Sequence, residues 1–351
     1  MVREITAILV SWKDEEDVVA AVSSLARARE RAGTDTPVSL VVVDNGGGLR
    51  GRCKILELWP DASILVNESN RGFGPAANQA AEGAPGDVLL FLNPDTRAEA
   101  DPFSEIARAF DAHPGAAAIA PRLLDFEDQS KIQNPKSKIV PRPLAPPGRE
   151  DQFTFQLRRL PTLANDAREL LLLDHVAPNN RARRRFRYAD ADREKVFSVE
   201  QAAAAALAVR KDLFLRLGGF DSRFVPAWFE DVDLAARLEP EGPILYWPSA
   251  QFRHRGGGAS QSLGYARFLP IYYRNALLYR RLHYALPARI AYRPLLAAGM
   301  LLRLLALPFR RSAPRPRAES VRAYVSTFFI ALGLGPRQSP ITNHQSPIPH
   351  A

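Results

Sequence analysis

The stretch Val88-Leu89-Leu90-Phe91-Leu92-Asn93-Pro94-Asp95 joins a continuous apolar run to a polar end. Five apolar residues in a row are typical of a strand that is buried on both faces, as in a parallel sheet covered by helices. In such sheets, ligands bind beyond the carboxyl ends of the strands. The stretch therefore predicts a buried strand with Asp95 at a ligand-binding edge.

Similar apolar runs lie on either side of this stretch and alternate with helical patterns. The expected strands are Ile5–Val10, Val38–Val43, Ala62–Val66 and Ala116–Pro121. The expected helices cover Glu15–Arg31, Asn78–Glu82 and Phe103–Ala112. Strands that alternate with helices predict an α/β domain with a Rossmann-like, mainly parallel sheet flanked by helices.

Residues 126–195 break this alternation. Prolines cluster between Pro135 and Pro147, and Arg181–Arg187 is a basic run. We expect a long, variable and partly mobile insertion, in which the basic run is a solvated face rather than a nucleic-acid site. The regular pattern returns with Val196–Arg210 and with a strand at Ile244–Trp247.

The composition limits the class of protein. The chain has 351 residues, of which 46% are hydrophobic and 24% are charged. This balance excludes collagen-like, disulfide-scaffold and wholly disordered proteins. The single cysteine, Cys53, cannot form an internal disulfide, which favours a reducing compartment. The first ten residues contain Glu4 and only a short apolar run, so we expect no signal peptide and a cytoplasmic location.

The formal net charge of +9 is unevenly distributed along the chain. Residues 1–241 hold 32 Lys and Arg against 37 Asp and Glu, whereas residues 242–318 hold 13 Arg and no acidic residue. The basic total alone favours a nucleic-acid binder, but the body is slightly acidic and carries no nucleic-acid-binding motif. We therefore expect an acidic body with a basic C-terminal region, and no nucleic-acid partner.

The C-terminal region combines this basic charge with apolar segments. Pro294–Phe309 is apolar except for Arg303, and its 16 residues fall short of the roughly 20 that span a bilayer. Ala323–Leu334 is shorter still. Both segments suit amphipathic helices at a membrane interface, and a helical cap on the core is an equally open interpretation. Residues 339–351 are predicted to be disordered.

Two polar clusters have the composition of a nucleotide site. Asp44-Asn45 follows a predicted strand, where a carboxylate can bond a ribose hydroxyl or a base N–H, although such an Asp also commonly forms a turn. Asn70-Arg71-Gly72-Phe73-Gly74, with Asn78 behind it, is a Gly-containing turn into a helix. Its N–H groups and Arg71 can face a phosphate or a base.

Three further groups can carry metal or proton chemistry. Asp95 can hold Mg²⁺ or Mn²⁺ through carboxylate oxygens, with a helix cap before the next helix as the alternative. His254 follows another strand end and can be a metal ligand, although a lone histidine is more commonly structural. Glu230-Asp231-Val232-Asp233 places three carboxylates within four residues, which raises their pKa values and suits a general base. The alternative is the acidic first turn of a helix, which we expect of Asp233.

Taken together, these stretches resemble the glycosyltransferase family 2 enzymes of the GT-A fold, and among them bacterial rhamnosyltransferases of cell-wall and O-antigen assembly. The stretches that carry the resemblance are Val41–Gly46, Asn70–Gly74 with Asn78, Phe91–Asp95, Gly218–Asp221, Phe229–Leu234 and His254. The resemblance implies a GT-A domain over residues 1–260, which contains the insertion, and a basic amphipathic helical region over residues 261–338.

The resemblance also implies roles for single residues. A nucleotide-sugar would be bound by Asp44, Asn45, Arg71, Gly72, Asn78 and Asn93. Asn93 and Asp95 stand where the family has its Asp-x-Asp motif, so that Asp95 and His254 would bind Mg²⁺ or Mn²⁺. Asp231 matches the catalytic base, and Glu230 would orient the acceptor or the base. Two stretches depart from the family pattern, Val10-Ser11-Trp12-Lys13 and Ala202–Ala206, where Ala204 stands nearest a common glycine.

The activity implied by the resemblance is inverting, metal-dependent transfer of a sugar from a nucleotide-sugar to a glycan or polyprenyl-linked acceptor. The favoured donor is dTDP-L-rhamnose, with galactofuranose or another hexose as alternatives. A non-catalytic nucleotide-binding scaffold is the alternative from another class, and Asp95, Asp231 and His254 argue against it. We expect residues 265–318 to contact an anionic membrane surface, which places the protein peripherally on the inner face of the plasma membrane.

Overall fold

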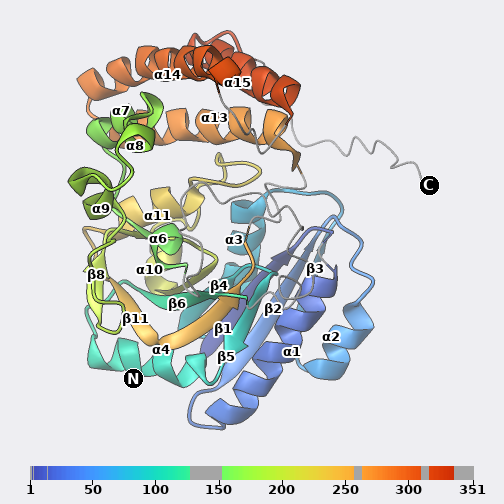
Figure 1. Ribbon diagram of the computed structural model, residues 1–351. Helices are drawn as coiled ribbons and strands as arrows, with labels where there is room; N and C mark the ends of the chain where they lie inside the picture. The colour runs from blue at the N-terminus through green and yellow to red at the C-terminus, as the bar shows by residue number, and fades with distance from the viewer. Residues whose placement is uncertain are drawn as a thin grey trace, which may run out of the picture.

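The computed structural model describes residues 2, 4–13, 15–126, 152–256, 263–309 and 316–335. Figure 1 shows an α/β body with a layer of helices stacked across one end of it. The strands of the body are β1 (Ile5–Ser11), β2 (Val38–Asn45), β3 (Ser63–Asn67), β4 (Val88–Leu92), β5 (Thr96–Glu99), β6 (Ala118–Asp125), β8 (Phe197–Val199), β10 (Ala206–Arg210) and β11 (Ile244–His254).

The central sheet is mixed, with a parallel N-terminal half. Its order is β3-β2-β1-β4-β10-β6-β11-β5, and β8 pairs with β11. Strands β1, β2, β3 and β4 are parallel to one another, and β6 is parallel to β11. Strand β10 runs antiparallel to both of its neighbours, β4 and β6. The predicted mainly parallel sheet is confirmed, with β10 as an antiparallel strand at its centre.

Helices cover both faces of the sheet, as the buried apolar strands require. One face packs against α1 (Glu15–Ala32) and α4 (Pro102–Ala112), with α2 (Arg52–Leu58) beside α1. The other face packs against α3 (Phe73–Gly83), α10 (Lys211–Arg216) and α11 (Glu230–Leu238). The two buried clusters use alternate residues of the same strands, such as Leu90 and Phe91 of β4.

One short strand was missed by the sequence analysis. Thr96 begins β5 instead of capping the next helix, and α4 starts later with Asp101 as its N-cap, accepting a hydrogen bond from Ser104 N. The four residues of β5 pair antiparallel with the end of β11, so that Thr96 lies opposite His254. A strand this short has too little pattern to be recognised from sequence.

The described part of the predicted insertion, residues 152–195, contains short helices rather than a structureless segment. These elements are α6 (Phe153–Gln156), β7 (Leu157–Arg158), α7 (Leu163–Leu170), α8 (Leu173–Val176) and α9 (Arg181–Phe186), and β7 pairs with β9 (Gln201–Ala202). Helix α9 has no buried residue, in agreement with a solvated basic face. Arg187, directly after α9, differs, because burial and then the charge of Arg158 lower its pKa to about 9. Residues 127–151 of the insertion lie outside the described ranges.

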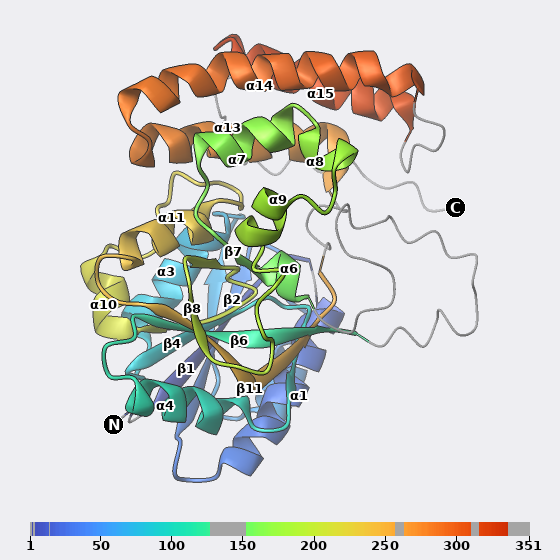
Figure 2. The same cartoon turned by 60° about the vertical axis from the view of Figure 1, so that its left-hand side comes forward.

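The C-terminal region forms the stacked layer seen in Figures 1 and 2, in which α13 lies between the body and the outer pair α14 and α15. The elements are α13 (Tyr265–His283), α14 (Leu286–Ala306), a 3₁₀ turn (Leu307–Phe309) and α15 (Arg317–Ala331). Helix α14 starts eight residues before the expected Pro294. In the described part of the chain, one helix, Leu286–Phe309, is both long enough and apolar enough to cross a membrane.

The C-terminal layer is joined to the body by buried polar contacts as well as by apolar packing. Arg280 of α13 forms a buried ion pair with Asp166 of α7, and the Tyr284 hydroxyl donates to Asp166 Oδ2 at 2.7 Å. His283 Nε2 lies 2.7 Å from Asp233 Oδ1 of α11. The layer therefore caps the side of the body from which α11 presents its first turn. The predicted disordered tail, residues 339–351, lies outside the described ranges.

Candidate active site

Strand pairing brings Asp95 and His254 together from distant parts of the chain. Asp95 lies between β4 and β5, and His254 ends β11. Because β5 turns back and pairs with β11, the two side chains meet, with His254 Nε2 3.3 Å from Asp95 Oδ1. The amide nitrogen of Asn93 lies 3.3 Å from the same ring nitrogen. Gly256 N donates to Asp95 Oδ2 at 2.8 Å, which fixes the carboxylate.

Gln152 determines which nitrogen of His254 carries the proton. Its side-chain nitrogen donates to Asp125 Oδ1 at 2.8 Å and to the His254 carbonyl, so its oxygen faces His254 Nδ1 at 2.8 Å. An amide oxygen only accepts, and Nδ1 therefore donates to it. The ring of His254 is 2% exposed and stacks on Phe155 with a centroid distance of 6.1 Å. Nε2 is left with its lone pair directed at Asp95 and Asn93.

The Asp95–His254 pair has the donor set of a divalent metal site. A metal-binding histidine commonly donates its second ring N–H to a fixed acceptor, as His254 does to Gln152. When Nδ1 carries the proton, His254 Nε2 and Asp95 Oδ1, which lie 3.3 Å apart, can each donate an electron pair to the same cation. Burial raises the pKa of Asp95, whereas a hydrogen bond from and a positive charge on His254, together with the Gly256 N–H, lower it by more, so positive charge at the Nε2 position favours the ionised carboxylate. Within the described residues, no cluster of three or more His, Cys, Asp or Glu forms a metal site.

The carboxylates of Glu230 and Asp231 begin α11 in different surroundings. Asp231 is half-buried and accepts hydrogen bonds from Ala204 N at 3.3 Å and from Val232 N at 2.8 Å. Burial raises the pKa of Asp231. Burial and then the charge of Asp231 raise the pKa of Glu230 well above its ordinary value. Glu230 Oε2 is buried and has no hydrogen-bond partner among the described residues. Of the two carboxyl groups, Glu230 therefore has the stronger tendency to hold a proton.

The link between β9 and β10 connects the two halves of the site. Ala204 N donates to Asp231, and the next carbonyl, Ala205 O, accepts from Asn93 N at 3.1 Å. Two consecutive residues, Ala204 and Ala205, therefore connect the base candidate to Asn93 beside the metal pair. Ala204 is 6% exposed, so the methyl group in place of the family's common glycine lies in this packed floor.

Asp44 and Asn45, at the end of β2, organise loops. Both oxygens of Asp44 accept backbone N–H groups, from Gly47 at 2.9 Å and Leu49 at 2.8 Å. Asn45 donates to Gly72 O at 3.1 Å and accepts from Arg71 N at 3.1 Å. Asp44 therefore closes a turn, which is the alternative to nucleotide binding that its position after a strand allowed. Nucleotide binding by Asp44 and Asn45 stays a prediction.

The Gly-containing turn at Arg71 is positioned against the chain that leads into α11. Gly72 has φ +89°, and an added Cβ would come within 3.0 Å of Pro226 O. Phe73 N donates to that same carbonyl at 2.8 Å. The side chain of Arg71 is exposed and donates a long hydrogen bond of 3.4 Å to Gln79 Oε1, so its guanidinium is accessible to a ligand.

Asn78 serves as a clamp between α3 and the turn before residue 221. Its amide nitrogen donates to Phe220 O at 2.7 Å, and its oxygen accepts from Phe220 N at 2.8 Å. A Cβ on Gly219 would lie 2.4 Å from Asn78 Oδ1, which explains the glycine at that position. Both polar groups of Asn78 thus bond to the protein backbone, and its contact with the nucleotide stays a prediction.

A strained turn leads into α11. Trp228 and Phe229 have φ of 77° and 75°, a left-handed conformation that non-glycine residues seldom adopt twice in succession. The amide of Asn275, on α13, donates to Ala227 O at 2.9 Å and to Trp228 O at 3.0 Å. The C-terminal layer therefore supports the turn that presents Glu230 and Asp231.

Sequence analysis missed Gln152, Arg158 and Asn275, and it noted Trp12 only as part of a departure from the family pattern. Arg158 of β7 has a buried Nε without a hydrogen-bond partner among the described residues, and its positive charge lowers the pKa of Asp231. Its guanidinium lies 5.9 Å from the ring of Phe155, which stacks on His254. Trp12 Nε1 is likewise buried and unpartnered in the described chain. The only sequence signal for Gln152 and Arg158 was their place in the insertion.

A mixed α/β sheet of this order, with amide, carboxylate and imidazole groups gathered beyond its strand ends, defines a glycosyltransferase of the GT-A fold. The chain belongs to glycosyl transferase family 2, whose family model matches residues 6–188. It is therefore an enzyme that transfers a sugar, as the sequence resemblance implied.

Comparison with individual proteins agrees with this family. An N-acetylglucosaminyl-diphospho-decaprenol L-rhamnosyltransferase of Mycobacterium tuberculosis is 25% identical over 268 residues, which cover 72% of this chain and 76% of the relative. Among solved structures, a mannosyltransferase from Pyrobaculum calidifontis, in complex with GDP-Man and Mn²⁺, has a TM-score of 0.53 at 13% identity, covering 94% and 88% of the two chains. GalNAc-T7 with UDP, GalNAc and Mn²⁺ has a TM-score of 0.52 at 10% identity, covering 95% of this chain and 56% of that one. These structures show a shared fold.

Proposed function

We propose that this enzyme moves L-rhamnose from dTDP-rhamnose to a polyprenyl-linked saccharide, with inversion at the transferred sugar, in cell-wall or surface polysaccharide assembly. The observation that carries the proposal is the placement of Asp231. Its carboxylate is held by Ala204 N, and the following residue, Ala205, holds Asn93 beside the Asp95–His254 pair. A proton acceptor and a cation site on one rigid frame suit attack by a hydroxyl on a sugar diphosphate.

Asp231 supplies the general base. Two backbone N–H groups fix its carboxylate, and its raised pKa keeps it basic enough to take a proton from an acceptor hydroxyl. As the O–H bond breaks, the acceptor oxygen forms a bond to the anomeric carbon from the face opposite the diphosphate. The bond to the diphosphate breaks and its electron pair leaves with the nucleotide. Glu230, whose pKa is raised by burial and by the charge of Asp231, is placed next to the base to orient the acceptor or the base.

Asp95 and His254 fit a resident Mg²⁺ or Mn²⁺, because each directs a lone pair into the same space. When bound there, the cation supplies positive charge that offsets the developing charge of the leaving diphosphate. Arg158 adds a second positive charge on the side of Asp231. Asn93, Arg71 and Gly72 line the neighbouring loops and are proposed to contact the nucleotide-sugar with Asp44 and Asn45.

The donor and the acceptor are proposed from the relative's name. That protein is an L-rhamnosyltransferase, and its named acceptor is an N-acetylglucosaminyl-diphospho-decaprenol. A polyprenyl-linked acceptor is present at a membrane, and the basic C-terminal layer suits an anionic lipid surface. We therefore place the protein peripherally on the inner face of the plasma membrane, with its active site in the cytoplasm.

A panel of nucleotide-sugars tests this proposal. Thermal stabilisation is measured with each donor, with and without Mn²⁺, since a ligand that binds only the folded state raises its melting point. Transfer to a short-chain polyprenyl diphosphate-linked N-acetylglucosamine is then followed for each donor. We expect dTDP-rhamnose with Mn²⁺ to stabilise most and to be consumed. Full activity after treatment with a chelator would contradict the roles of Asp95 and His254.

Two alternatives are decided by the same panel. Consumption of a galactofuranose donor or of another hexose donor, without consumption of dTDP-rhamnose, would keep the family activity and replace the sugar. Stabilisation by nucleotides without transfer to any acceptor would favour a nucleotide-binding scaffold. The half-buried Asp231, held by two backbone N–H groups, and the orientation of His254 by Gln152 favour the enzyme.

A further inference from the structure

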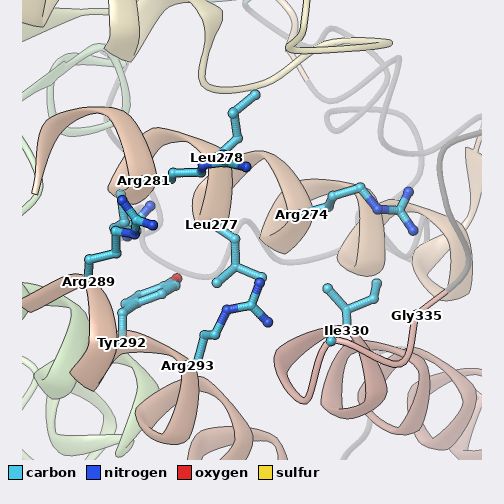
Figure 3. A pocket seen from close by; sticks show the side chains of 11 residues that line it. Arg274, Leu277, Leu278, Arg281, Arg289, Tyr292, Arg293, Ile330 and Gly335 are labelled. Atoms are coloured by element: carbon cyan, nitrogen blue, oxygen red, sulfur yellow. The ribbon is translucent and has the colours of Figure 1, made fainter. Parts of the chain in front are cut away.

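A cavity of about 370 Å³ lies between α13, α14 and α15, and its lining includes none of the site residues described above. Five arginines line it, with Tyr292 among them and no Asp or Glu: Arg274, Arg280, Arg281, Arg289 and Arg293. Figure 3 shows Arg281 of α13 and Arg289 of α14 at one end and Arg274 at the other, with Arg293 between them. Such a lining favours an anion.

The charge on this cavity is only partly neutralised by the protein. Arg280 is buried and paired with Asp166 behind the cavity wall. Arg293 donates to the carbonyl of Ala331 at 3.1 Å, which is a neutral partner. Within the described residues, Arg281, Arg289 and Arg293 form no ion pair. Among the described residues, three solvent-accessible guanidinium groups thus line one open pocket without a carboxylate partner.

The helices that form the cavity also expose an apolar face. On α14 and its 3₁₀ turn, the exposed apolar side chains recur at helical spacing, at Leu286, Ile290, Leu301, Leu305 and Phe309. On α15 and just beyond it they are Val321, Val325, Phe329, Leu332 and Leu334. Leu305 is 71% and Phe309 85% exposed. Exposed apolar side chains gathered on two packed helices in this way are typical of a contact with a membrane or with another protein.

We propose that the cavity binds the phosphate headgroup of an anionic phospholipid while the exposed face of α14 and α15 enters the surrounding lipid. Leu286 and Ile290 flank Arg289 in sequence, so the apolar and cationic groups lie on neighbouring positions of one helix. A ligand with an anionic head and apolar tails satisfies both, whereas a free anion would leave the apolar face in water. This inference rests on the proposed membrane association and gives it a defined binding site.

The position of Arg280 shows why the catalytic turn and this cavity remain separate sites. Its guanidinium lies 4.4 Å from the ring of Tyr292 at the cavity and 5.1 Å from the ring of Phe229, which precedes Glu230. Arg280 therefore forms the partition between them. Substitution of the other arginines leaves this partition and the catalytic residues in place.

The test uses flotation of the full chain with vesicles of phosphatidylcholine alone and of phosphatidylcholine with phosphatidylglycerol. One variant carries Arg281→Gln, Arg289→Gln and Arg293→Gln. A matched control carries Arg267→Gln, Arg317→Gln and Arg322→Gln, three exposed arginines of the same layer that do not line the cavity. Both variants lose the same charge, and their melting temperatures report whether they fold.

We expect the wild type to bind vesicles that contain phosphatidylglycerol, and the cavity variant to bind them about 100-fold more weakly, given about fivefold for each arginine. The control should lose much less. Equal losses in the two variants would assign binding to diffuse surface charge and overturn the cavity. Stabilisation of the wild type by inorganic diphosphate, with vesicle binding unchanged in the cavity variant, would make the ligand a soluble anion and also overturn it.

The vesicle-binding test can fail without contradicting the proposed glycosyl transfer. Transfer to a water-soluble acceptor analogue should be unchanged in the cavity variant, since its three arginines are outside the site. Absence of wild-type binding to both kinds of vesicle would overturn the membrane association and the cavity together, while leaving the glycosyl-transfer assay to judge the chemistry alone.

Discussion

The side-chain oxygen of Gln152 lies 2.8 Å from Nδ1 of His254, and this contact orients the imidazole toward Asp95. Gln152 is itself held by Asp125 and by the His254 carbonyl, so its amide has one arrangement only. A residue from the insertion therefore sets the proton position on a histidine that is 102 residues away in the sequence.

Replacing Gln152 with Leu should weaken metal binding. The variant loses the acceptor for Nδ1–H, so the ring is free to change tautomer and orientation. Because loss of such a supporting contact typically weakens metal binding 10–100-fold, we expect a decrease in Mn²⁺ affinity of about 10–100-fold. The measurement is Mn²⁺ binding by calorimetry or electron paramagnetic resonance. Phe155→Leu is the control, because it removes the stacked ring and keeps the hydrogen bond. Unchanged Mn²⁺ affinity in the Gln152 variant would refute the role of Gln152.

Replacing Asp231 with Asn should abolish most turnover without loss of fold. The amide keeps the shape of the carboxylate but cannot accept the acceptor's proton, so kcat should fall by about 10²–10⁴-fold. Thermal stabilisation by the nucleotide-sugar should persist. Asp233→Asn is the matched control on the same helix. It weakens contacts to Arg237 and His283 and should lower the melting temperature while sparing kcat. The assignment of Asp231 as the base fails if Asp233→Asn lowers kcat and Asp231→Asn spares it.

The strand order and the site were predictable to different extents. Continuous apolar runs such as Val88–Leu92 identify buried strands without any tertiary information, and the polar residues after them identify the ligand edge. Contacts between distant segments were not predictable, because they depend on which strands pair. The four residues of β5 bring Asp95 to His254, and nothing in their sequence indicates that pairing. The clamp made by Asn78 was hidden in the same way, since its partner lies 142 residues away.

The C-terminal layer shows a second limit of sequence patterns. An apolar stretch counted from Pro294 gave a length below that of a membrane span, whereas the helix starts at Leu286. Pro294 lies inside α14 rather than at its start, and the preceding turns are amphipathic, so the apolar count began too late. Composition did identify the basic charge of the region, but only the packing shows which arginines face the cavity.

The activity should depend on pH through Asp231. The base acts in its ionised form, and burial raises its pKa, so kcat/KM should fall on the acidic side at a pH above the value of about 3.9 for an ordinary aspartate. Arg158→Gln removes a positive charge that lowers this pKa, and it should move the acidic limb to higher pH. The measurement is the pH profile of kcat/KM over the range in which the fold is stable. A limb that moves to lower pH in the variant would contradict the electrostatic role of Arg158.

Glu230→Gln should stabilise the protein as the pH rises. The folded state raises the pKa of Glu230 well above the value of about 4.3 expected when unfolded, so the folded protein favours the protonated form. Below that unfolded value both states are protonated and the variant should match the wild type. Above it, ionisation increasingly disfavours the wild-type fold, and the variant should gain about 1–3 kcal/mol, the cost of an unsatisfied buried group.

The comparison is made by denaturant unfolding at several pH values. Glu239→Gln, an exposed change at the other end of the same helix, serves as the control and should give no such trend. A Glu230 variant that is less stable than the wild type at alkaline pH would show that the buried carboxylate has a partner that stabilises its charge.

Replacing Asn275 of α13 with Leu should destabilise the turn that precedes Glu230 and Asp231, because the C-terminal layer then no longer supports it. The side chain is 1% exposed and donates to the carbonyls of Ala227 and Trp228, and its loss removes this donor from two acceptors beside a strained backbone. We expect about 1–3 kcal/mol of lost stability and a lower kcat, with nucleotide affinity retained. Thr327→Val is the control, because it removes a buried hydroxyl that bonds only within α15. If both variants lose stability and both keep the wild-type kcat, then α13 caps the body without supporting catalysis.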